Sequence, residues 1–598
     1  MPDAVFDEQE LGKAYDAQLV RRVWDYVRPY RRVFWAALLL SPLNQLFSLA
    51  QPYLVKVAID SYVLLGDADG LRTVGLVFMV AIVGEFGSYY AQQYLTMIVA
   101  QRSLADLRVG LFTHLQRLPM SFFDRTPVGR IVSRVTSDVD VLNEMFAAGA
   151  MTIVLDLLKL FGIVGFMLWI NWELALMSMA LLPVMVLGVD FFRRAARRTY
   201  RQIRARVARI NGYLQEAISG MCVIQISARE DATFEEFRGL NAAHNEAAHR
   251  SNRYEAALFS MVEAVSTVSI AFMLWRGRGL HAGDVVELGT LVAFIQYIQQ
   301  FFVPIRDFSA KYAVMQSAMT AAERIFGLLD LPPEDRPTPG RVPAVTRGAI
   351  EFDHVWFAYR NEDWVLRDVS LRIAGGEHVA IVGATGAGKT TIIKLLDRLY
   401  DVQRGSVRVD GIDVREWDQT ALRERIAVVL QDVFLFEGPI AANITLGRGD
   451  IGPERVRAAA RHVNADAFIR GVGGYDALLR ERGANLSTGQ RQLLAFARAI
   501  AHDPRILVLD EATSSVDPET EWLIQDALKK LLKGRTSLVI AHRLSTIEHA
   551  DRIVVLHKGV VREEGTHAEL LKRGGLYARL YEYQYVRRGR RDAVSHPA

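Results

Sequence analysis

Cysteine is almost absent from this sequence of 598 residues. Its single cysteine, Cys222, excludes an intramolecular disulfide and any Cys-rich metal site. We also expect no cleavable signal peptide, because the first 30 residues are charged and mixed and contain no early apolar run. The formal net charge of +4 is small for this length, so charge gives no indication of a nucleic-acid partner.

Apolar residues are abundant instead. Hydrophobic residues make up 51% of a chain that is also 23% charged, which predicts an apolar part joined to a soluble part. Each apolar segment is long enough for a hydrocarbon core of about 30 Å, which needs about 20 helical residues. We place six such segments near 33–55, 73–99, 145–170, 174–192, 256–275 and 288–308. The alternative, buried helices of a large soluble protein, does not account for six such runs, and prolines within them are tolerated in membrane helices.

Basic residues predict the orientation of these spans. Arginines are dense between spans two and three and between spans four and five, where eight occur from Arg193 to Arg209. The opposite loops are short and poor in basic residues. The positive-inside rule therefore places both termini and both long connections in the cytoplasm. Those connections have helical patterns, so we expect the membrane helices to continue well beyond the bilayer. An amphipathic stretch at 19–27, within a polar segment 1–32, is suited to a membrane surface.

Five ionisable residues fall inside the predicted spans: Glu85, Asp156, Lys159, Asp190 and Glu263. Such groups face a cavity or a partner and are functional candidates. Asp156 and Lys159 are three residues apart on one helix and can neutralise each other, so a structural pairing stands beside a substrate role. Asp190 lies near a span end and can extend to the interface. Glu85 and Glu263 are the stronger candidates for a cavity.

A proline-dense stretch from Leu331 to Gly340 marks a boundary, and the pattern beyond it is soluble α/β. The predicted fold is an α-helical membrane domain of six transmembrane helices fused to an α/β P-loop nucleotide-binding domain. The predicted divisions are an N-terminal segment 1–32, a transmembrane domain 33–329, a linker 330–345, a nucleotide-binding domain 346–585 and a basic tail 586–598.

The clearest motif is Gly383-Ala384-Thr385-Gly386-Ala387-Gly388-Lys389-Thr390, which fits G-x-x-x-x-G-K-[ST]. An apolar strand pattern precedes it and a helical pattern that begins with Thr391 follows, which is the context of a phosphate-binding loop. Its backbone N–H groups and the helix N-terminus attract phosphates. We expect Lys389 to reach the β- and γ-phosphates of ATP and Thr390 to bind Mg²⁺.

Further residues complete an ATP site at the predicted strand ends. Asp510 ends a buried strand and helps to hold Mg²⁺. Glu511 follows directly and is placed to orient or deprotonate the attacking water. Three weaker candidates are Gln431 for Mg²⁺ and water, His542 for the γ-phosphate and Tyr359 for adenine stacking; a Gln or His at a strand end is also a common structural residue.

A second phosphate-facing element is predicted at Asn485-Leu486-Ser487-Thr488-Gly489-Gln490. Ser487 and Gln490 have the spacing of a capping box, so this stretch begins a helix. A helix N-terminus with a serine hydroxyl is an anion site. Because the chain already has one phosphate loop, a second such element indicates an ATP that is shared between two copies.

The stretch Leu486–Gln490 resembles the signature motif of ATP-binding cassette (ABC) transporters, and the order of parts from Tyr359 to His542 matches their nucleotide domain. Ser514-Ser515-Val516-Asp517 resembles the loop that couples the two ATP sites, and Glu481-Arg482-Gly483 the loop before the signature. The whole chain resembles a half-size type IV exporter of the bacterial multidrug and lipid class. By this resemblance, 123–130 lies beside the first coupling helix and 211–216 falls where the second is expected.

The resemblance implies a dimer in which each ATP lies between one chain's Walker motifs and the other's signature. Thr488 departs from the glycine usual in the family, whereas the Walker residues, Glu511 and His542 match it. Paired half-transporters typically have one degenerate site, so we predict the catalytic half of a heterodimer; an ordinary homodimer that tolerates threonine is the alternative.

We therefore predict ATP-driven export of amphiphilic drugs or lipids across the cytoplasmic membrane by alternating access, with ATP and Mg²⁺ as cofactors. A second half-transporter chain, the lipid bilayer and the cargo are the expected partners. An ATP-gated channel on the same scaffold is an alternative, although Glu511 favours turnover. Export of peptides or siderophores is another, although no N-terminal peptidase-like Cys/His pair supports peptide processing. An importer is disfavoured because the spans are fused directly to the ATPase.

Overall fold

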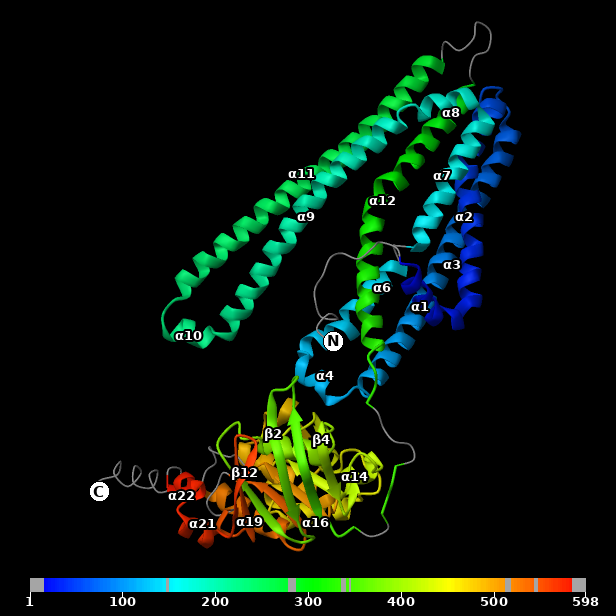
Figure 1. Cartoon of the computed structure of the whole chain (residues 1–598). Helices are drawn as coiled ribbons and strands as arrows, with labels where there is room; N and C mark the ends of the chain where they lie inside the picture. Colours follow the sequence, from blue (N-terminus) through cyan, green and yellow to red (C-terminus); the bar gives the residue numbers. More distant parts are fainter. Residues whose placement is uncertain are drawn as a thin grey trace. The chain divides into compact units, whose positions relative to one another are not determined.

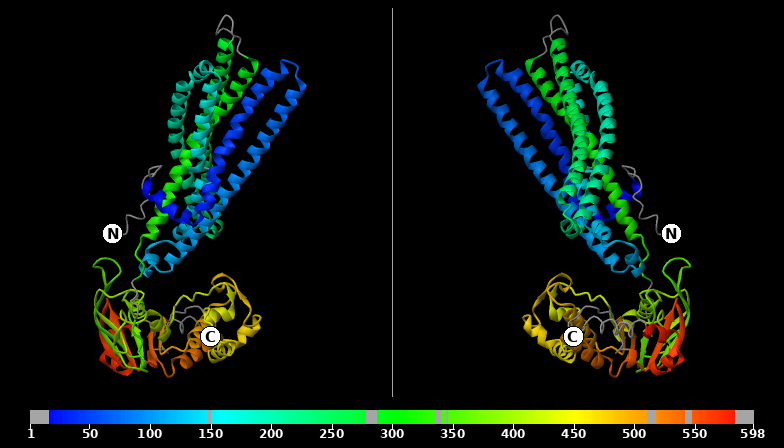
Figure 2. Two further views of the ribbon diagram at one scale, coloured as in Figure 1. Left: turned by 90° about the vertical axis from the view of Figure 1, so that its right-hand side faces the viewer. Right: turned by 90° about the vertical axis from the view of Figure 1, so that its left-hand side faces the viewer.

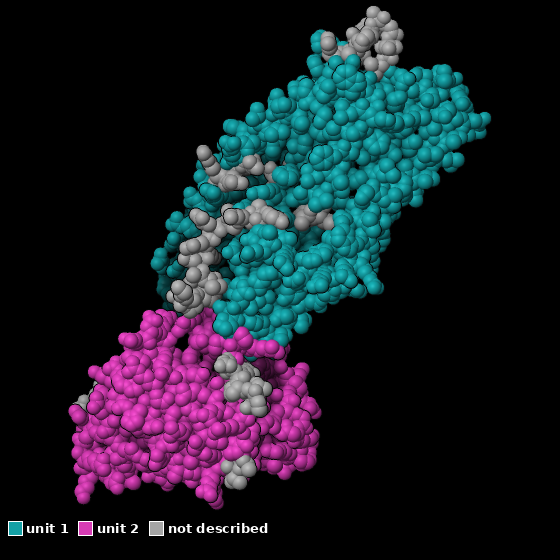
Figure 3. Space-filling view, turned by 45° about the vertical axis from the view of Figure 1, so that its right-hand side comes forward, with its two compact units in different colours: residues 1–116, 127–332 teal, residues 117–126, 333–598 magenta. Residues whose placement is uncertain are grey.

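A computed structural model of the whole chain describes residues 16–146, 150–277, 287–334, 340–343, 346–510, 518–541 and 547–582. The chain forms two compact units (Figure 3). Unit 1 contains residues 1–116 and 127–332, and unit 2 contains residues 117–126 and 333–598. The second junction lies within the predicted linker. The other junction differs from the predicted divisions. Residues 117–126 fall within the predicted transmembrane domain 33–329, yet these ten residues belong to unit 2, the α/β half.

Unit 1 is helical. Within the described residues, six helical segments are long and apolar enough to cross a membrane, which confirms the six predicted spans. Its helices are α1 (Ala17–Val27), η2 (Arg28–Tyr30), α2 (Arg31–Ala58), η3 (Ile59–Val63), α3 (Ala68–Leu115), α5 (Val128–Val135), α6 (Ser137–Glu144), α7 (Ala150–Ile170), α8 (Trp172–Met179), α9 (Leu182–Ser219), α10 (Met221–Ile226), α11 (Glu230–Gly277) and α12 (Leu288–Leu329).

The long helices extend beyond a bilayer, as the sequence predicts. Helices α3 and α11 have 48 residues each, about 70 Å at the α-helical rise. Local chemistry explains where helices of unit 1 begin. The Asp67 carboxylate accepts from the N–H groups of Asp69 and Gly70 to cap α3, and the Asn171 side chain caps α8. Pro183 stands in the first turn of α9, where its missing N–H costs nothing.

Helices α9 and α11 run side by side and are joined by the short helix α10 (Figures 1 and 2). The Tyr213 hydroxyl of α9 donates to the carbonyl of Thr233 on α11 at 2.8 Å. The stretch 211–216, where the resemblance places a second coupling helix, lies inside α9. The short helix at the turn is α10, because the chain breaks at Gly220 rather than earlier.

Two of the five ionisable residues of the spans, Asp156 and Glu85, bond to side chains of neighbouring helices, and Asp190 pairs with Arg194 on its own helix α9. Asp156 of α7 is ion-paired with Lys311 of α12, a partner that the sequence pattern does not indicate. The predicted neighbour Lys159 attracts both Asp156 and Glu85 electrostatically. Glu85 accepts a hydrogen bond from the Gln51 amide of α2. These contacts join α2, α3, α7 and α12 through polar groups within an apolar bundle.

Unit 2 combines helices with two main sheets. The strands are β1 (Ile350–Ala358), β2 (Trp364–Ile373), β3 (His378–Val382), β4 (Arg404–Val409), β5 (Ile412–Asp413), β6 (Ile426–Val429), β7 (Gly438–Pro439), β8 (Leu478–Leu479), β9 (Ile506–Asp510), β10 (Thr536–Ile540), β11 (Arg552–His557) and β12 (Val560–Gly565). The helices are α4 (Met120–Arg125), α13 (Lys389–Leu396), α14 (Gln419–Arg425), α15 (Ile440–Thr445), α16 (Pro453–His462), α17 (Asp466–Gly471), η5 (Glu481–Gly483), α18 (Thr488–Ala501), α19 (Pro518–Leu532), α21 (His567–Arg573) and α22 (Leu576–Tyr581).

The six-stranded sheet of unit 2 has the order β12-β11-β3-β10-β9-β6. Its strands pair in parallel except at β11–β12. A four-stranded antiparallel sheet has the order β2-β1-β4-β5. Strand β3 is buried over Val379–Val382, the continuous apolar pattern of a strand covered on both faces. The observed fold confirms the predicted class of membrane helices followed by a P-loop α/β domain.

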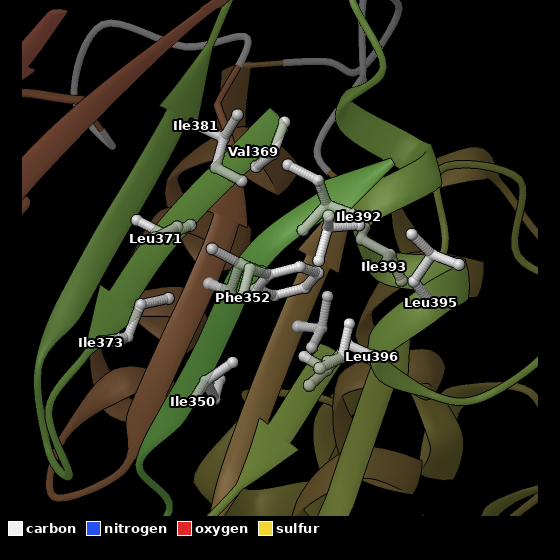
Figure 4. Packing of buried hydrophobic residues seen from close by; sticks show 14 of the residues in the cluster. Ile350, Phe352, Val369, Leu371, Ile373, Ile381, Ile392, Ile393, Leu395 and Leu396 are labelled. Carbon is white, nitrogen blue, oxygen red and sulfur yellow. The ribbon is translucent and has the colours of Figure 1, made fainter. Parts of the chain in front are cut away.

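One hydrophobic core of unit 2 lies where helix α13 packs between the two sheets (Figure 4). Ile392 and Leu396 of α13, Phe352 of β1 and Ile381 of β3 belong to this cluster, and all four are at most 2% exposed. Burial of such side chains contributes about 1.5–3 kcal/mol each. Because α13 begins directly after the phosphate loop, this packing fixes the position of the loop at the end of β3.

Candidate nucleotide site

The phosphate loop connects β3 to α13 and has a backbone that favours glycine at two positions. Gly386 and Gly388 have φ values of +80° and +102°, in the left-handed region. At Gly383 a Cβ atom would lie 2.2 Å from the carbonyl oxygen of Leu556. The predicted glycines are thus required by the shape of the loop. That shape brings the loop N–H groups and the N-terminus of α13 together as an anion site.

Lys389 begins α13, and its side chain lies back over the loop. Its Nζ atom donates to the carbonyl oxygens of Gly383 at 2.8 Å and Ala384 at 3.1 Å. Burial lowers the pKa of Lys389, whereas attraction by Asp510 raises it. The Lys389 ammonium is held by neutral carbonyl oxygens, which position it without neutralising its charge.

The Thr390 hydroxyl donates to the Asp510 carboxylate, with the two oxygens 3.3 Å apart. Asp510 ends strand β9, and β9 pairs in parallel with β6, which ends two residues before Gln431. The carboxyl ends of parallel strands meet at one edge of a sheet. Hydroxyl, carboxylate and amide oxygens are ligands suited to Mg²⁺, so this donor set fits the predicted metal. Glu511, Asp517 and His542 lie outside the described residues.

Tyr359 follows β1 and is contacted by helix α4 of the same unit. Arg125 donates to the Tyr359 carbonyl at 2.7 Å. Asp124 accepts from the Tyr400 hydroxyl at 2.5 Å and from Lys394 at 3.2 Å. Lys394 in turn lies 5.3 Å and 5.6 Å from the ring centres of Tyr359 and Tyr400. Helix α4 therefore touches both the backbone and the aromatic surroundings of the residue predicted to stack on adenine.

The same residues line a hollow of about 360 Å³ in unit 2. It is open on one side and runs between Tyr359 and the exposed Thr390. The Tyr359 hydroxyl is 3.1 Å from the Thr391 hydroxyl, which ties this aromatic ring to the first turn of α13. Burial, and then the hydrogen bond to Asp124, raise the pKa of Tyr400, so its phenol stays protonated and donates. Adenine stacking by Tyr359 remains a prediction.

The predicted signature element begins helix α18 with the expected capping box. Gln490 N–H donates to the Ser487 hydroxyl at 3.2 Å, and Ser487 N–H donates to the Gln490 side chain at 3.0 Å. Ser487 and Thr488 are exposed, whereas Gly489 is buried. Because the Ser487 oxygen accepts the cap bond, its own proton is available for an outside acceptor such as a phosphate oxygen.

Thr488 has a contact that the sequence does not reveal. Its hydroxyl accepts from Arg491 Nη2 at 3.1 Å, and Arg491 Nη1 donates to the Leu486 carbonyl at 2.9 Å. Sequence reasoning also missed Lys394 and Tyr400. Lys394 lies four residues after Thr390, one turn along α13, which is a weak signal for the same face. Asp124 is about 270 residues from both, so no local pattern could identify the contact.

Comparison with known proteins identifies the family. The sequence profile of the ABC transporter transmembrane region matches residues 34–305, and that of the ABC transporter domain matches residues 366–514. The chain belongs to the ABC transporter family. The two profiles follow one another in the order that the predicted halves require, and together they cover more than half of the chain.

Relatives of this ABC transporter match it over nearly its whole length. An uncharacterised ABC transporter ATP-binding protein of Bacillus subtilis (strain 168) is 37% identical over 97% of this chain and 96% of its own. An ATP-dependent lipid A-core flippase of Desulfotalea psychrophila is 33% identical over 95% and 99%. Another Bacillus subtilis relative, whose name assigns it provisionally to multidrug export, is 34% identical over 95% and 99%.

A solved structure of a bacterial Atm1-family ABC exporter with ATP bound superposes with a TM-score of 0.75 and 27% identity. The match covers 93% of this chain and 98% of that one. The transporter is thus a type IV ABC exporter that binds ATP and couples its hydrolysis to export across a membrane. The motifs in the sequence predicted a type IV ABC exporter, and this family assignment is confirmed.

Proposed function

We propose that this ABC exporter moves amphiphilic small molecules or lipids across the cytoplasmic membrane by alternating access. The observation that carries the proposal is the packing of α4 against Tyr359, Lys394 and Tyr400. Helix α4 is joined through the chain to α3 and α5, so a change at the phosphate loop reaches the membrane helices through it. The names of relatives that act on lipid A-core or are linked to drugs support an amphiphilic cargo.

The residues around the phosphate loop act on the negative charge of the ATP phosphates. Lys389 binds the β- and γ-phosphates, and Thr390, Asp510 and Gln431 would hold Mg²⁺. When bound, Mg²⁺ neutralises charge on the phosphate oxygens. Glu511 orients the attacking water and His542 contacts the γ-phosphate. These two roles are inferred from sequence alone.

Two chains form the working transporter in this proposal. Ser487 of one chain donates to the γ-phosphate bound in the other, and Asp517 lies in the loop that links the two sites. The exposed N-terminus of α18 supports this arrangement, because its cap leaves a donor that faces outward. On α10 the apolar side chains of Met221, Val223 and Ile226 are 42%, 67% and 80% exposed. The partner chain covers such a surface in a dimer.

The partner is a second, different half-transporter. Thr488 supports this view, because the site that uses this signature is altered while the chain's own phosphate loop has the residues of a productive site. Both termini and the nucleotide domain lie in the cytoplasm, as the arginine-rich connections indicate. The productive ATP site is then the one that uses Lys389 together with the partner's signature.

The test is transport by proteoliposomes in which Lys389 is replaced. Lys389→Ala removes the ammonium that neutralises phosphate charge, so ATP-dependent uptake of a fluorescent amphiphile falls to background while membrane insertion is unchanged. Lys533→Ala, an exposed lysine of the same unit, is the matched control and keeps wild-type uptake. Uptake that survives Lys389→Ala overturns the proposal.

A further inference from the structure

Helix α1 of unit 1 contacts two helices whose ends lead into unit 2. Helix α3 ends at Leu115, beside the junction at 116/117, and α12 ends at Leu329, shortly before the junction at 332/333. Val23 and Val27 of α1 are 8% and 1% exposed, so this side of the helix is covered by the protein itself. The contacts of α1 therefore lie where the chain passes from one unit to the other.

Tyrosines attach α1 and the following turn η2 to α3. The Tyr30 hydroxyl of η2 donates to the Asp106 carboxylate of α3 at 2.8 Å. Tyr26 of α1 lies over Gly110 of α3, where an added Cβ atom would be 3.6 Å from the tyrosine hydroxyl. Both contacts fall within the last three turns of α3. The N-terminal segment is thus fixed to the end of α3.

Arg22 attaches α1 to the end of α12. Its two Nη atoms donate to the two carboxylate oxygens of Asp330 at 2.8 Å and 2.7 Å, a bidentate arrangement that fixes direction as well as distance. The same guanidinium lies 4.3 Å from the ring centre of Phe326, one turn earlier on α12. Phe326 is 2% exposed, so its ring is itself held in the bundle. Tyr26 and Asp25 also attract Arg22 electrostatically.

The position of Asp330 has no explanation within α12. It directly follows the last residue of that helix, where the helix dipole disfavours a negative charge. Arg22 compensates this charge, and His114, in the last turn of α3, also attracts Asp330. The carboxylate therefore connects the end of α12 to α1 and to α3.

The chain beyond Asp330 has little slack. The Glu334 N–H donates to the Arg117 carbonyl at 2.7 Å, and the Gln419 amide donates to the Glu334 side chain at 3.2 Å. Both partners of Glu334 belong to unit 2. Only Leu331, Pro332 and Pro333 separate it from Asp330, and proline fixes φ and stiffens a linker. A displacement of unit 2 is therefore passed directly to the residue that Arg22 holds.

We propose that Arg22 is a positioning residue of the export cycle. Through its bond to Asp330 it makes α1 and the ends of α3 and α12 move as one body when unit 2 changes state. The inference rests on the proposed export function and adds a second connection to that through α4. The competing explanation is that the bond only stabilises the fold, and the experiments below separate the two.

The first experiment measures how many molecules of a fluorescent amphiphile are transported for each ATP hydrolysed, in proteoliposomes of the assembled transporter. Arg22→Gln removes the charge and the bidentate donor. We expect this ratio to fall about fivefold, with ATPase activity in the absence of cargo unchanged. Arg21→Gln, at the neighbouring exposed arginine, is the control and keeps the wild-type ratio. Loss of a purely stabilising bond lowers the midpoint of thermal unfolding and both activities together, so an unchanged ratio in Arg22→Gln overturns the proposal.

The second experiment replaces the ion pair by a covalent link. Cys222→Ser removes the single cysteine, and Arg22→Cys and Asp330→Cys are then joined by a bifunctional methanethiosulfonate reagent. The two side chains are 37% and 59% exposed, so the reagent can reach both positions. We expect the unlinked variant to have the low ratio of Arg22→Gln and the linked variant to regain most of the wild-type ratio. Loss of transport on linking would show that α1 and α12 must separate during the cycle, which contradicts the proposal.

The third experiment needs no cargo. Spin labels at Gln18→Cys of α1 and Glu323→Cys of α12, both exposed positions, report the distance between the two helices in the Cys222→Ser chain. We expect one narrow intrachain distance that is the same without nucleotide and with ATP and orthovanadate. Adding Arg22→Gln should broaden this distance or make it depend on ATP; if it does neither, Arg22 does not hold the helices together.

These distances also separate the inference from the export function. If the distance is constant in the wild type and broadens in Arg22→Gln, yet proteoliposomes show no ATP-dependent uptake, the proposed export fails and the role of Arg22 in joining the helices stands. If uptake occurs and the wild-type distance changes with ATP, export stands and the positioning role fails.

Discussion

Two lysines, the buried Lys389 of unit 2 and the partly exposed Lys311 of unit 1, are held in opposite ways. In unit 2, Lys389 donates to the carbonyl oxygens of Gly383 and Ala384. In unit 1, Lys311 is paired with the Asp156 carboxylate. Carbonyl oxygens position an ammonium without cancelling its charge, so Lys389 can still attract phosphate. The Asp156 carboxylate cancels the charge of Lys311, so Lys311 needs no further anion.

Two further cations of unit 2, Arg491 and Lys394, also differ in whether their partners are neutral or charged. Arg491, at the N-terminal turn of α18, is held by the Leu486 carbonyl and the Thr488 hydroxyl, which are neutral. Lys394 is held by the Asp124 carboxylate and lies over aromatic rings. Lys389 and Arg491, at the N-termini of α13 and α18, thus have neutral partners. Lys394, which joins α13 to α4, has a carboxylate partner.

The largest expected effect comes from breaking the pair in unit 1. Lys311→Met removes the ammonium that is bonded to the Asp156 carboxylate among apolar helices and leaves the electrostatic attraction of Lys159 as the remaining described compensation. We expect it to lower the free energy of unfolding of unit 1 by about 3 kcal/mol, whereas Lys389→Met removes ATPase activity with little effect on stability. Thermal unfolding followed by tryptophan fluorescence measures both. Adding Asp156→Leu to Lys311→Met should restore most of the lost stability; if it does not, neutralisation is not the function of Lys311.

The next largest effect is expected at Asp397, a buried carboxylate whose negative charge nearby cations offset only in part. Asp397 follows α13, and its burial raises its pKa to about 6 although Arg423 attracts it in the opposite sense. The folded state therefore binds this proton more tightly than the unfolded state. The resulting stability is present at pH 4 and is lost as the pH rises toward 6. We expect Asp397→Asn to flatten this dependence and to stabilise unit 2 by about 1–2 kcal/mol at pH 7.5.

Unfolding of the isolated wild-type and Asp397→Asn chains at several pH values measures this difference. Asp401→Asn is the matched control, because Asp401 is an exposed carboxylate four residues away, bonded to Arg398. If the free energy of unfolding of Asp397→Asn still falls between pH 4 and pH 6 as in the wild type, this pH dependence belongs to another group.

The sequence predicted the parts of the molecule whose chemistry is local. The phosphate loop needs glycines at φ values that other residues avoid, and it needs a strand before it and a helix after it. All of these requirements fall within about 20 neighbouring residues. The capping box of Ser487 and Gln490 is similarly contained in four residues. The six apolar segments are visible because a bilayer demands a run of fixed length.

Contacts between distant segments were not predictable in this way. Asp156 has a possible partner three residues away in Lys159, yet its ion pair is with Lys311, which is 155 positions along the chain. The predicted position of the second coupling helix failed for a related reason. The stretch 211–216 is as good a helix as its neighbours, and the actual turn depends on where α11 packs back on α9. Helix α4 carries no signal that it belongs to the α/β unit.

The third prediction tests whether α4 transmits the state of the nucleotide site. Asp124→Asn removes the charge that holds Lys394 and weakens the bond from Tyr400, a loss of about 1–2 kcal/mol for a partly exposed charged hydrogen bond. We expect stimulation of the ATPase by a transported amphiphile to fall several-fold. Tyr400→Phe removes only the hydroxyl contact and should have a smaller effect in the same direction. Unchanged stimulation in Asp124→Asn would exclude this contact from transmission.

The smallest effect is expected at Thr488. Its hydroxyl is a neutral partner of Arg491, and it can be removed without changing the number of charged residues. Thr488→Gly removes the hydroxyl that accepts from Arg491 Nη2 and leaves that donor open to a phosphate. If Thr488 is what makes this signature unproductive, ATPase activity of the purified chain alone should rise a few-fold, from a weak wild-type value. Thr488→Ser keeps the hydroxyl and should stay near wild type. Vigorous activity of the wild-type chain alone would instead favour a homodimer, because the altered signature would then already support turnover.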